Sequence, residues 1–186
     1  MDARKTYKTA LVIIPPENLW PPIQAIRKRH DRAFRRWMPH ITMVYPFRPK
    51  EEFHGLAADL SNLCRDFEPF TVELTQFRFF VHSKKNYTLW LAPEPESQLI
   101  EMQSALLQIV PDCNEVNLFA SGFTPHLSVG QVQGRSKIDA VLQEFQQRWK
   151  PLSFAVREIS LIWRGDPPDD VFQVAHTVAL EGKGHP

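Results

Sequence analysis

The sequence predicts an α+β protein made of two similar lobes, and three observations lead to this prediction. Apolar runs with the period of a strand alternate with amphipathic runs that have the period of a helix. The order strand, helix, short strand, helix, long strand occurs twice, once from Thr9 and again from Thr88. Short polar or proline-containing links join strands that follow one another, as in antiparallel pairs. We therefore expect two pseudo-twofold-related lobes, each an antiparallel sheet with outer helices, flanking a central cleft.

The length and composition fit a single globular domain over residues 1–186, with a sizeable core. The formal net charge of +1 does not indicate a strongly basic nucleic-acid binder. No apolar run approaches the roughly 18 residues of a membrane span, and the start of the chain lacks the apolar stretch of a signal peptide. Cys64 and Cys113 have no CxxC partner and are predicted to be buried thiols in a reducing compartment. We expect a monomer in the cytoplasm, with the nucleus as an alternative, and no membrane contact.

The first copy of the pattern begins with a buried, β-branched run that two prolines end. Pro21 and Pro22 suit the first turn of the helix that follows, because a residue there needs no backbone N–H. A stripe of apolar residues at helical spacing indicates a second helix. The expected elements are a strand over 9–14, a helix over 21–30, a strand over 40–45, a helix over 51–67 and a strand over 70–81.

The second copy follows a polar link over 82–86, which indicates a hairpin with a five-residue loop. Pro111 ends its first helix, and the turn over 165–168 indicates another hairpin near the C-terminus. The matching of the two copies places Val72 opposite Phe154 in sequence register. The expected elements are a strand over 87–92, a helix over 96–110, a strand around 125–129, a helix over 138–149 and strands over 152–164 and 171–180.

Each copy contains one short stretch that reads proline, histidine, apolar, hydroxyl, apolar. Alternate side chains of a strand share a face, so His40 lies beside Thr42 and His126 lies beside Ser128. The apolar residues between them face the opposite way, toward a core. One such stretch arises readily by chance, whereas two in matching positions of a duplicated pattern indicate a function.

Paired histidines and hydroxyls suit the cleavage of a phosphodiester. A base must activate the nucleophile while an acid protonates the leaving oxygen on the opposite side of phosphorus. Histidine titrates near neutral pH, so His40 and His126 can supply one neutral and one charged ring. Thr42 and Ser128 can donate hydrogen bonds to the non-bridging oxygens of the phosphate. We expect no metal and no cofactor, because the sequence lacks a metal-ligand motif. A partial metal site and two structural histidines remain the alternatives.

At these residues the sequence resembles the two-histidine phosphoesterase superfamily. The Pro-His-Ile-Thr and Thr-Pro-His-Leu-Ser stretches are similar to those of its 2'-5' RNA ligase-like branch, which includes RNA 2',3'-cyclic phosphodiesterases and 2',5'-oligonucleotide phosphodiesterases. The resemblance covers nearly the whole chain in element order, although only the two short motifs are specific. It implies a two-lobed fold, catalysis by His40 and His126, and a 2'-phosphate product.

Other residues are weaker candidates for substrate binding. Aromatic side chains near the motif strands could stack on a base, and basic side chains at strand ends could hold phosphate or ribose. Gln131 lies where some relatives carry a tyrosine near the substrate. The basic segment 27–36 could form a rim that attracts phosphate, although a solvated helix face is the simpler interpretation. The candidates are Tyr45, His82, Phe123, Gln131, Trp163 and Arg164; the remaining histidines, His30, His54, His176 and His185, are predicted to be surface or structural residues.

Three hypotheses for the function follow. The first is a metal-independent phosphodiesterase that opens 2',3'-cyclic phosphates on nucleotides or RNA ends. The second is a 2',5'-phosphodiesterase or 2'-5' RNA ligase that uses the same four residues. The third is an RNA-binding module without turnover, which the presence of both imidazoles argues against. For the enzymatic hypotheses, the assignment favoured from sequence is His126 as base and His40 as acid, although the near-symmetry of the site leaves this open.

Overall fold

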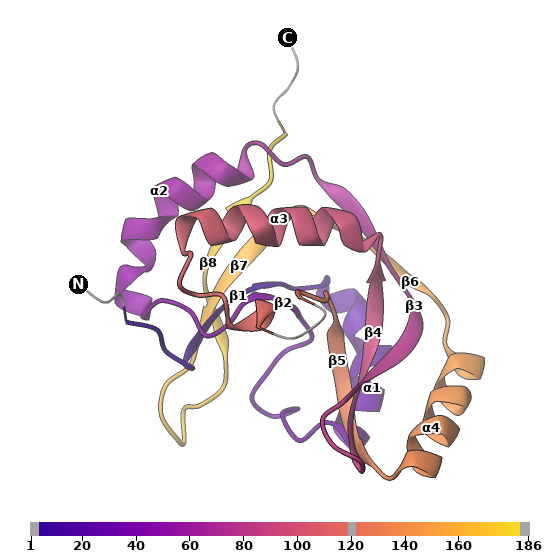
Figure 1. Ribbon diagram of the computed structural model, residues 1–186. Helices are drawn as coiled ribbons and strands as arrows, with labels where there is room; N and C mark the ends of the chain where they lie inside the picture. Colours follow the sequence, from indigo (N-terminus) through magenta and orange to yellow (C-terminus); the bar gives the residue numbers. More distant parts are fainter. Residues whose placement is uncertain (1–3, 119–121, 183–186) are drawn as a thin grey trace.

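A computed structural model describes residues 4–118 and 122–182, and this part of the chain forms two four-stranded antiparallel sheets (Figure 1). The first sheet has the order β2-β1-β7-β8 and the second has the order β5-β4-β3-β6. The first sheet consists of β1 (Thr9–Ile13), β2 (Ile41–Val44), β7 (Glu158–Trp163) and β8 (Gln173–Ala179). The second consists of β3 (Phe70–Val81), β4 (Asn86–Glu94), β5 (Leu127–Gln133) and β6 (Leu152–Val156). The predicted two-lobed α+β class is confirmed.

Four α-helices accompany the sheets in the described residues: α1 (Trp20–His30), α2 (Phe53–Cys64), α3 (Glu96–Ile109) and α4 (Arg135–Arg148). Short 3₁₀ turns precede α1 and α2 and follow α3, at Glu17–Leu19, Lys50–Glu52 and Glu115–Asn117. The helix expected over 51–67 is therefore shorter than predicted, and the one expected over 138–149 begins earlier. Proline lies at the start of α1, as its fixed backbone angle favours.

The duplicated pattern is visible in the sheets, but the long strand of each copy of the pattern belongs to the sheet of the other copy. The long strand of the first half, β3, pairs with β4 of the second half. The long strand of the second half reaches β1 through its later part, β7. The two long strands also pair with each other where they begin, and there Val72 lies directly opposite Phe154. Since these two residues match in the duplication, the approximate twofold axis passes between them.

The strand expected over 152–164 is wrong as a single element. It divides at Arg157 into β6, which pairs with β3, and β7, which pairs with β1. Arg157 lies outside both strands, and its carbonyl accepts a hydrogen bond from the backbone N–H of Leu180 at 2.8 Å. The buried alternation changes phase at this break, from Phe154 and Val156 on β6 to Ile159 and Leu161 on β7, so that both parts bury a face in the same core. The prediction from sequence overlooked this change of phase and joined the two parts into one strand.

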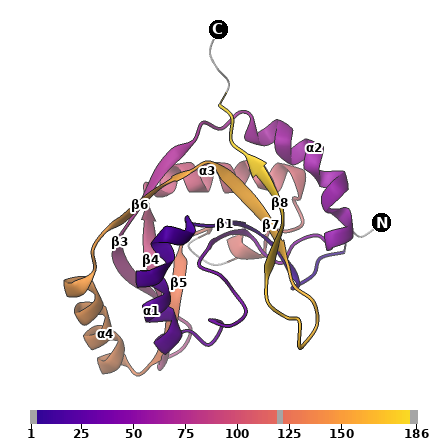
Figure 2. The same cartoon turned by 180° about the vertical axis from the view of Figure 1, so that it is seen from behind.

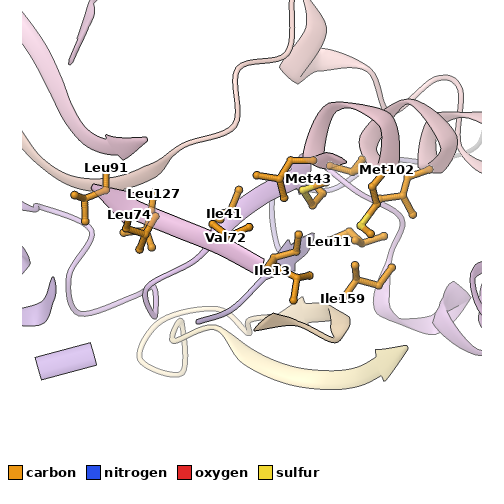
Figure 3. Close-up of a cluster of buried hydrophobic side chains, with 14 of the residues drawn as sticks. Leu11, Ile13, Ile41, Met43, Val72, Leu74, Leu91, Met102, Leu127 and Ile159 are labelled. Carbon is orange, nitrogen blue, oxygen red and sulfur yellow. The ribbon is translucent and has the colours of Figure 1, made fainter. Parts of the chain in front are cut away.

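One main apolar core connects the two sheets (Figure 3). Leu11 and Met43 of the first sheet lie near Met102 of α3, while Leu74 and Leu127 of the second sheet lie at the other end of the same cluster. The remaining helices cover the sheets across the duplication: α1 of the first half lies along β5 of the second half in both views (Figures 1 and 2). The histidine strands of the two halves are thus fixed against one another through shared packing.

Two further sequence expectations concern the cysteines and the membrane. Cys64 and Cys113 are buried free thiols, as predicted, and burial raises the pKa of each to about 11. In the described ranges, no helix combines the length and apolar character that crossing a membrane requires. His185, and Ser121 in the loop before the second histidine motif, lie outside the described residues.

Candidate functional site

The two motif histidines each lie one residue before a short strand. His40 precedes β2 and His126 precedes β5. The apolar residues that follow them are buried in the main core, as the alternation predicts: Ile41, Met43, Leu127 and Val129. The alternate residues, Thr42 and Ser128, keep partial exposure on the opposite face, and both histidines are also partly exposed. Each strand thus presents an imidazole and a hydroxyl on its face away from the core.

The imidazoles are held by matching hydrogen bonds. Nδ1 of His40 lies 2.7 Å from the carbonyl oxygen of Met38, and Nδ1 of His126 lies 2.8 Å from that of Thr124. A carbonyl oxygen can only accept, so both Nδ1 atoms carry the proton and donate it. Nε2 is therefore the nitrogen that can accept a proton in each neutral ring. The two halves of the chain fix the same tautomer in the same way, which is the arrangement that paired acid–base chemistry needs.

Burial lowers the pKa of both rings. The pKa of His40 falls from 6.5 to about 4, chiefly through desolvation, while the bond to Met38 opposes the change. The positive charges of Arg27 and of a protonated His126 lower it further, and Asp31 raises it. Desolvation also lowers the pKa of His126, although the hydrogen bond to the carbonyl of Thr124 raises it. β2 and β5 also contact one another, so the two histidines lie at the starts of neighbouring strands.

An aromatic wall on the second sheet adjoins His126. The Phe80 ring lies 4.9 Å from the His126 ring and stacks on Trp90 at 4.8 Å. Trp90 pairs directly with Ser128 across β4 and β5, so the two side chains share a face. On the other side Trp90 pairs with Arg78, whose guanidinium lies 6.0 Å from the indole. Sequence reasoning missed these residues, because their alternation on β3 and β4 was visible but their closeness to His126 depends on strand pairing.

The aromatic side chains that contact His40 are arranged differently from those that contact His126. Trp37 stacks on His40 at 4.6 Å and on Phe172 at 3.7 Å. Behind it lies a second, small apolar cluster on the face of the first sheet that carries Thr42, formed by Ala10, Val12, Ile162 and Phe172 with Trp37, Met38, Tyr45 and Ile14. The matching face of the second sheet carries Arg78 exposed and Phe80 and Thr88 partly exposed. One side of the site is thus filled and the other is open.

Three of the weaker candidates lie near this site. The Tyr45 ring meets the edge of Trp37 at 5.4 Å, and its hydroxyl donates to the carbonyl of Tyr7 at 3.3 Å. The Arg164 guanidinium lies 5.6 Å from the Phe172 ring. His82 directly follows β3, and its Nε2 lies 2.8 Å from the Thr88 hydroxyl. Their roles in binding stay predictions.

The other three candidates have structural contacts. Phe123 packs against the main core. The Trp163 ring lies 3.3 Å from the Nζ of Lys50, a cation–π contact. The Gln131 side chain is engaged with Asp31 and with the backbone of Arg32, on the segment that follows α1. Of the remaining described histidines, His30 packs on Phe145, while His54 and His176 are exposed.

A hollow of about 560 Å³ lies between α4 and β3, and neither histidine lines it. Its polar lining is mostly glutamine, which offers neither a nucleophile nor a proton donor tuned for catalysis. Among the residues described, no group of three or more His, Cys, Asp or Glu side chains is placed to hold a metal. The chemistry of the described chain is therefore concentrated at the paired histidines.

The paired histidine–hydroxyl strands on two pseudo-twofold-related sheets define the class, a two-histidine phosphoesterase. Residues 15–168 match the model of the 2'-5' RNA ligase superfamily, and the chain belongs to that superfamily. A Bacillus licheniformis protein whose name describes it as an inferred phosphoesterase is 27% identical over 146 residues, which cover 76% of this chain and 80% of the relative. An Oceanobacillus iheyensis protein with the same kind of name is 23% identical over 160 residues, covering 86% and 91%.

Solved structures share the fold. The protein TT0787 of Thermus thermophilus matches with a TM-score of 0.66 at 18% identity, over 95% of this chain and 99% of that one. LigT of E. coli complexed with 3'-AMP matches with a TM-score of 0.60 at 19% identity, over the same shares. At such identities the likeness establishes the fold, while the superfamily and the named relatives indicate a phosphoesterase with phosphodiesterase or ligase activity.

Proposed function

We propose that the protein is a metal-independent phosphodiesterase that hydrolyses 2',3'-cyclic phosphates on nucleotides or RNA ends to 2'-phosphates. One observation carries the proposal: His40 and His126 are anchored identically through Nδ1, which leaves two Nε2 atoms for proton transfer in one site. The protein would act as a single-domain monomer in the cytoplasm, with the nucleus as the alternative. The partner is a nucleotide or RNA end that bears a phosphodiester.

In this mechanism one neutral imidazole accepts a proton from water through Nε2 as the water oxygen attacks phosphorus. The other, protonated imidazole donates its Nε2 proton to the ribose 3'-oxygen as the bond from phosphorus to that oxygen breaks. Thr42 and Ser128 donate to the non-bridging oxygens, whose negative charge increases in the transition state. The product keeps its phosphate on the 2'-oxygen, and each turnover consumes one water.

The different side chains around His40 and His126 suggest which imidazole is the base and which is the acid. The nucleoside, the bulky part of the substrate, would lie over the open second sheet, with its base against Phe80. This places the leaving 3'-oxygen near His126 and the attacking water near His40. A pKa of about 4 also keeps His40 neutral at pH 7, as a base requires. We therefore propose His40 as base and His126 as acid, the reverse of the assignment favoured from sequence.

Nucleotide binding in this fold has support from E. coli LigT, whose structures include complexes with 3'-AMP, ATP and NADP+. The superfamily name favours one alternative, a 2',5'-phosphodiesterase or 2'-5' RNA ligase. Both would use the same two histidines and two hydroxyls. The RNA-binding module without turnover is the outcome that remains if no phosphodiester is cleaved.

A substrate panel tests the proposal. The panel contains 2',3'-cyclic nucleotides, 2',5'-oligoadenylate, 3',5'-linked RNA and ADP-ribose cyclic phosphate, with products identified by phosphorus NMR. We expect the cyclic nucleotides to be opened fastest and to yield 2'-phosphates, and the His40→Ala and His126→Ala variants to be the inactive controls. Preferred cleavage of the 2',5' linkage, or a 3'-phosphate product, would contradict the proposal.

The placement of the nucleoside has its own test. Phe80→Ala should raise KM for a cyclic nucleotide several-fold with little change in kcat, because it removes a stacking surface worth about 1–3 kcal/mol. Val81→Ala is the matched control, since Val81 is the next residue on β3 and is 61% exposed. Equal kinetic effects of the two substitutions would show that the base does not lie on Phe80.

A further inference from the structure

A buried ion pair lies at the end of α1, next to the site. The side chains of Arg27 and Asp31 are only 2% and 4% exposed, and Arg27 Nε donates to Asp31 Oδ2 at 2.9 Å. Burying two charges is costly unless their remaining donors and acceptors are also satisfied. The positions of those remaining hydrogen bonds therefore indicate what the pair holds together.

Asp31 Oδ1 accepts one local hydrogen bond, from the backbone N–H of Ala33 at 2.9 Å, and a second one that leads into the other half of the chain. Asp31 Oδ1 accepts from Nε2 of Gln131 on β5 at 3.3 Å. The Gln131 Oε1 atom in turn accepts from the backbone N–H of Arg32 at 3.0 Å. The end of α1 also presses directly on this strand, because a Cβ added to Gly130 would collide with His30. The ion pair is thus tied to the strand that carries His126 and Ser128.

Arg27 Nη1 donates to Gln24 on the same helix at 3.0 Å, and the other terminal nitrogen leads toward His40. Arg27 Nη2 donates to the carbonyl oxygen of Trp37 at 2.9 Å. The Trp37 ring stacks on His40 with an angle of 19° between the ring planes, and the next carbonyl, that of Met38, accepts the His40 Nδ1 proton. The backbone that Arg27 holds therefore fixes the His40 ring both at its face and at its anchored nitrogen.

We propose that Gln131, Asp31 and Arg27 form a positioning network that sets His40 against His126. The strand of one catalytic histidine is connected through three side chains to the loop of the other. The two rings come from different halves of the chain and share no backbone element, so their relative orientation needs such a connection. The kinetic consequence rests on the proposed phosphodiesterase function, whereas the effect on the state of His40 does not.

Gln131→Met is the decisive substitution, because it keeps the length of the side chain and removes both hydrogen bonds. Asp31 then loses one donor, so its charge acts more strongly on His40 and should raise the His40 pKa. The same change should lower kcat for a 2',3'-cyclic nucleotide by roughly tenfold with little change in KM, since a misplaced ring affects the reaction more than binding. Gln133→Met, on the same strand at an exposed position, is the control.

The measurement is a proton NMR titration of both histidines, together with kcat, KM and the urea midpoint of unfolding. The network predicts that the pKa of His40 changes although His126 is far closer to Gln131 in sequence. A changed His40 pKa and a lower kcat, with His126 and the Gln133→Met control as in the wild type, would support it. A change at His126 alone, or a lower urea midpoint with kcat and both pKa values unchanged, would overturn it in favour of a purely structural connection.

A second variant keeps the test decisive if Gln131→Met does not fold. Gln131→Asn retains the amide but shortens the side chain by one methylene, so the expected effects are the same in direction and smaller. If the wild type turns over no phosphodiester, the proposed function fails. The titration of His40 then still decides whether the network exists.

Discussion

The low pKa of His40 predicts a specific loss of stability in acid. The folded protein binds a proton at His40 only near pH 4, whereas the unfolded chain binds it near 6.5. Protonation therefore favours the unfolded state as the pH falls from 6.5 toward 4, and the stability contributed by neutral His40 is lost over that range. Between pH 7 and pH 5, linkage gives a loss of about 2 kcal/mol from this residue alone.

The assay is urea unfolding of the wild type and of His40→Gln at pH 7 and pH 5. Glutamine does not titrate, so the wild type should lose about 2 kcal/mol more than the variant over this interval. Both proteins contain the same carboxylates, so the difference between their pH dependences of stability reports His40. His54→Gln, at an exposed position, is the control and should follow the wild type. Equal losses for wild type and His40→Gln, or an NMR midpoint for His40 near 6.5, would refute the desolvation of this ring.

Four further predictions concern catalysis. His40→Ala and His126→Ala should each reduce turnover by roughly 10²–10⁴, and the double variant should be only slightly worse, because the pair acts as a unit; a loss below tenfold in both would remove their assignment. Activity should survive dialysis against EDTA, and loss on chelation with recovery on adding zinc or magnesium would instead favour a metal site. The profile of kcat/KM against pH should be a bell with both limbs below 6.5, since burial lowers the pKa of both rings in the free enzyme; a bell centred above 7 would contradict this. With a p-nitrophenyl phosphodiester, whose leaving group needs no proton, His126→Ala should recover activity and His40→Ala should not; the opposite pattern would make His126 the base.

The sequence was informative where the chemistry lies within one short strand. His40 with Thr42, and His126 with Ser128, could be placed on one face because the period of a strand is two residues and the apolar partners face the core. The duplication then indicated two equivalent lobes without knowledge of any contact. These inferences need only local geometry, so they agree with the structure.

The parts that were missed depend on pairing between distant strands. Arg78 and Trp90 adjoin Ser128 only because β3, β4 and β5 lie side by side in that register. The break at Arg157 leaves a trace in the sequence, because the alternation changes phase between Val156 and Ile159, but the change of partner strand leaves none. The role of Gln131 in substrate binding stays a prediction, but its hydrogen bonds to Asp31 and Arg32 are contacts that no local pattern could reveal.

The duplication also explains why a nearly symmetric pair of histidines can work on an asymmetric substrate. In the second sheet Ser128, Trp90 and Arg78 form a row across three strands, and the matching row of the first sheet is Thr42, Val12 and Ser160. Val12 and Ser160 are small and buried, so this row of the first sheet has no counterpart to Trp90 or to the exposed Arg78. Hydrolysis of a cyclic phosphate needs room for a nucleoside on one side of phosphorus and only for water on the other. Ligation of two RNA ends needs room on both sides. The filled first sheet therefore favours hydrolysis over ligation, although both reactions would use the same two histidines.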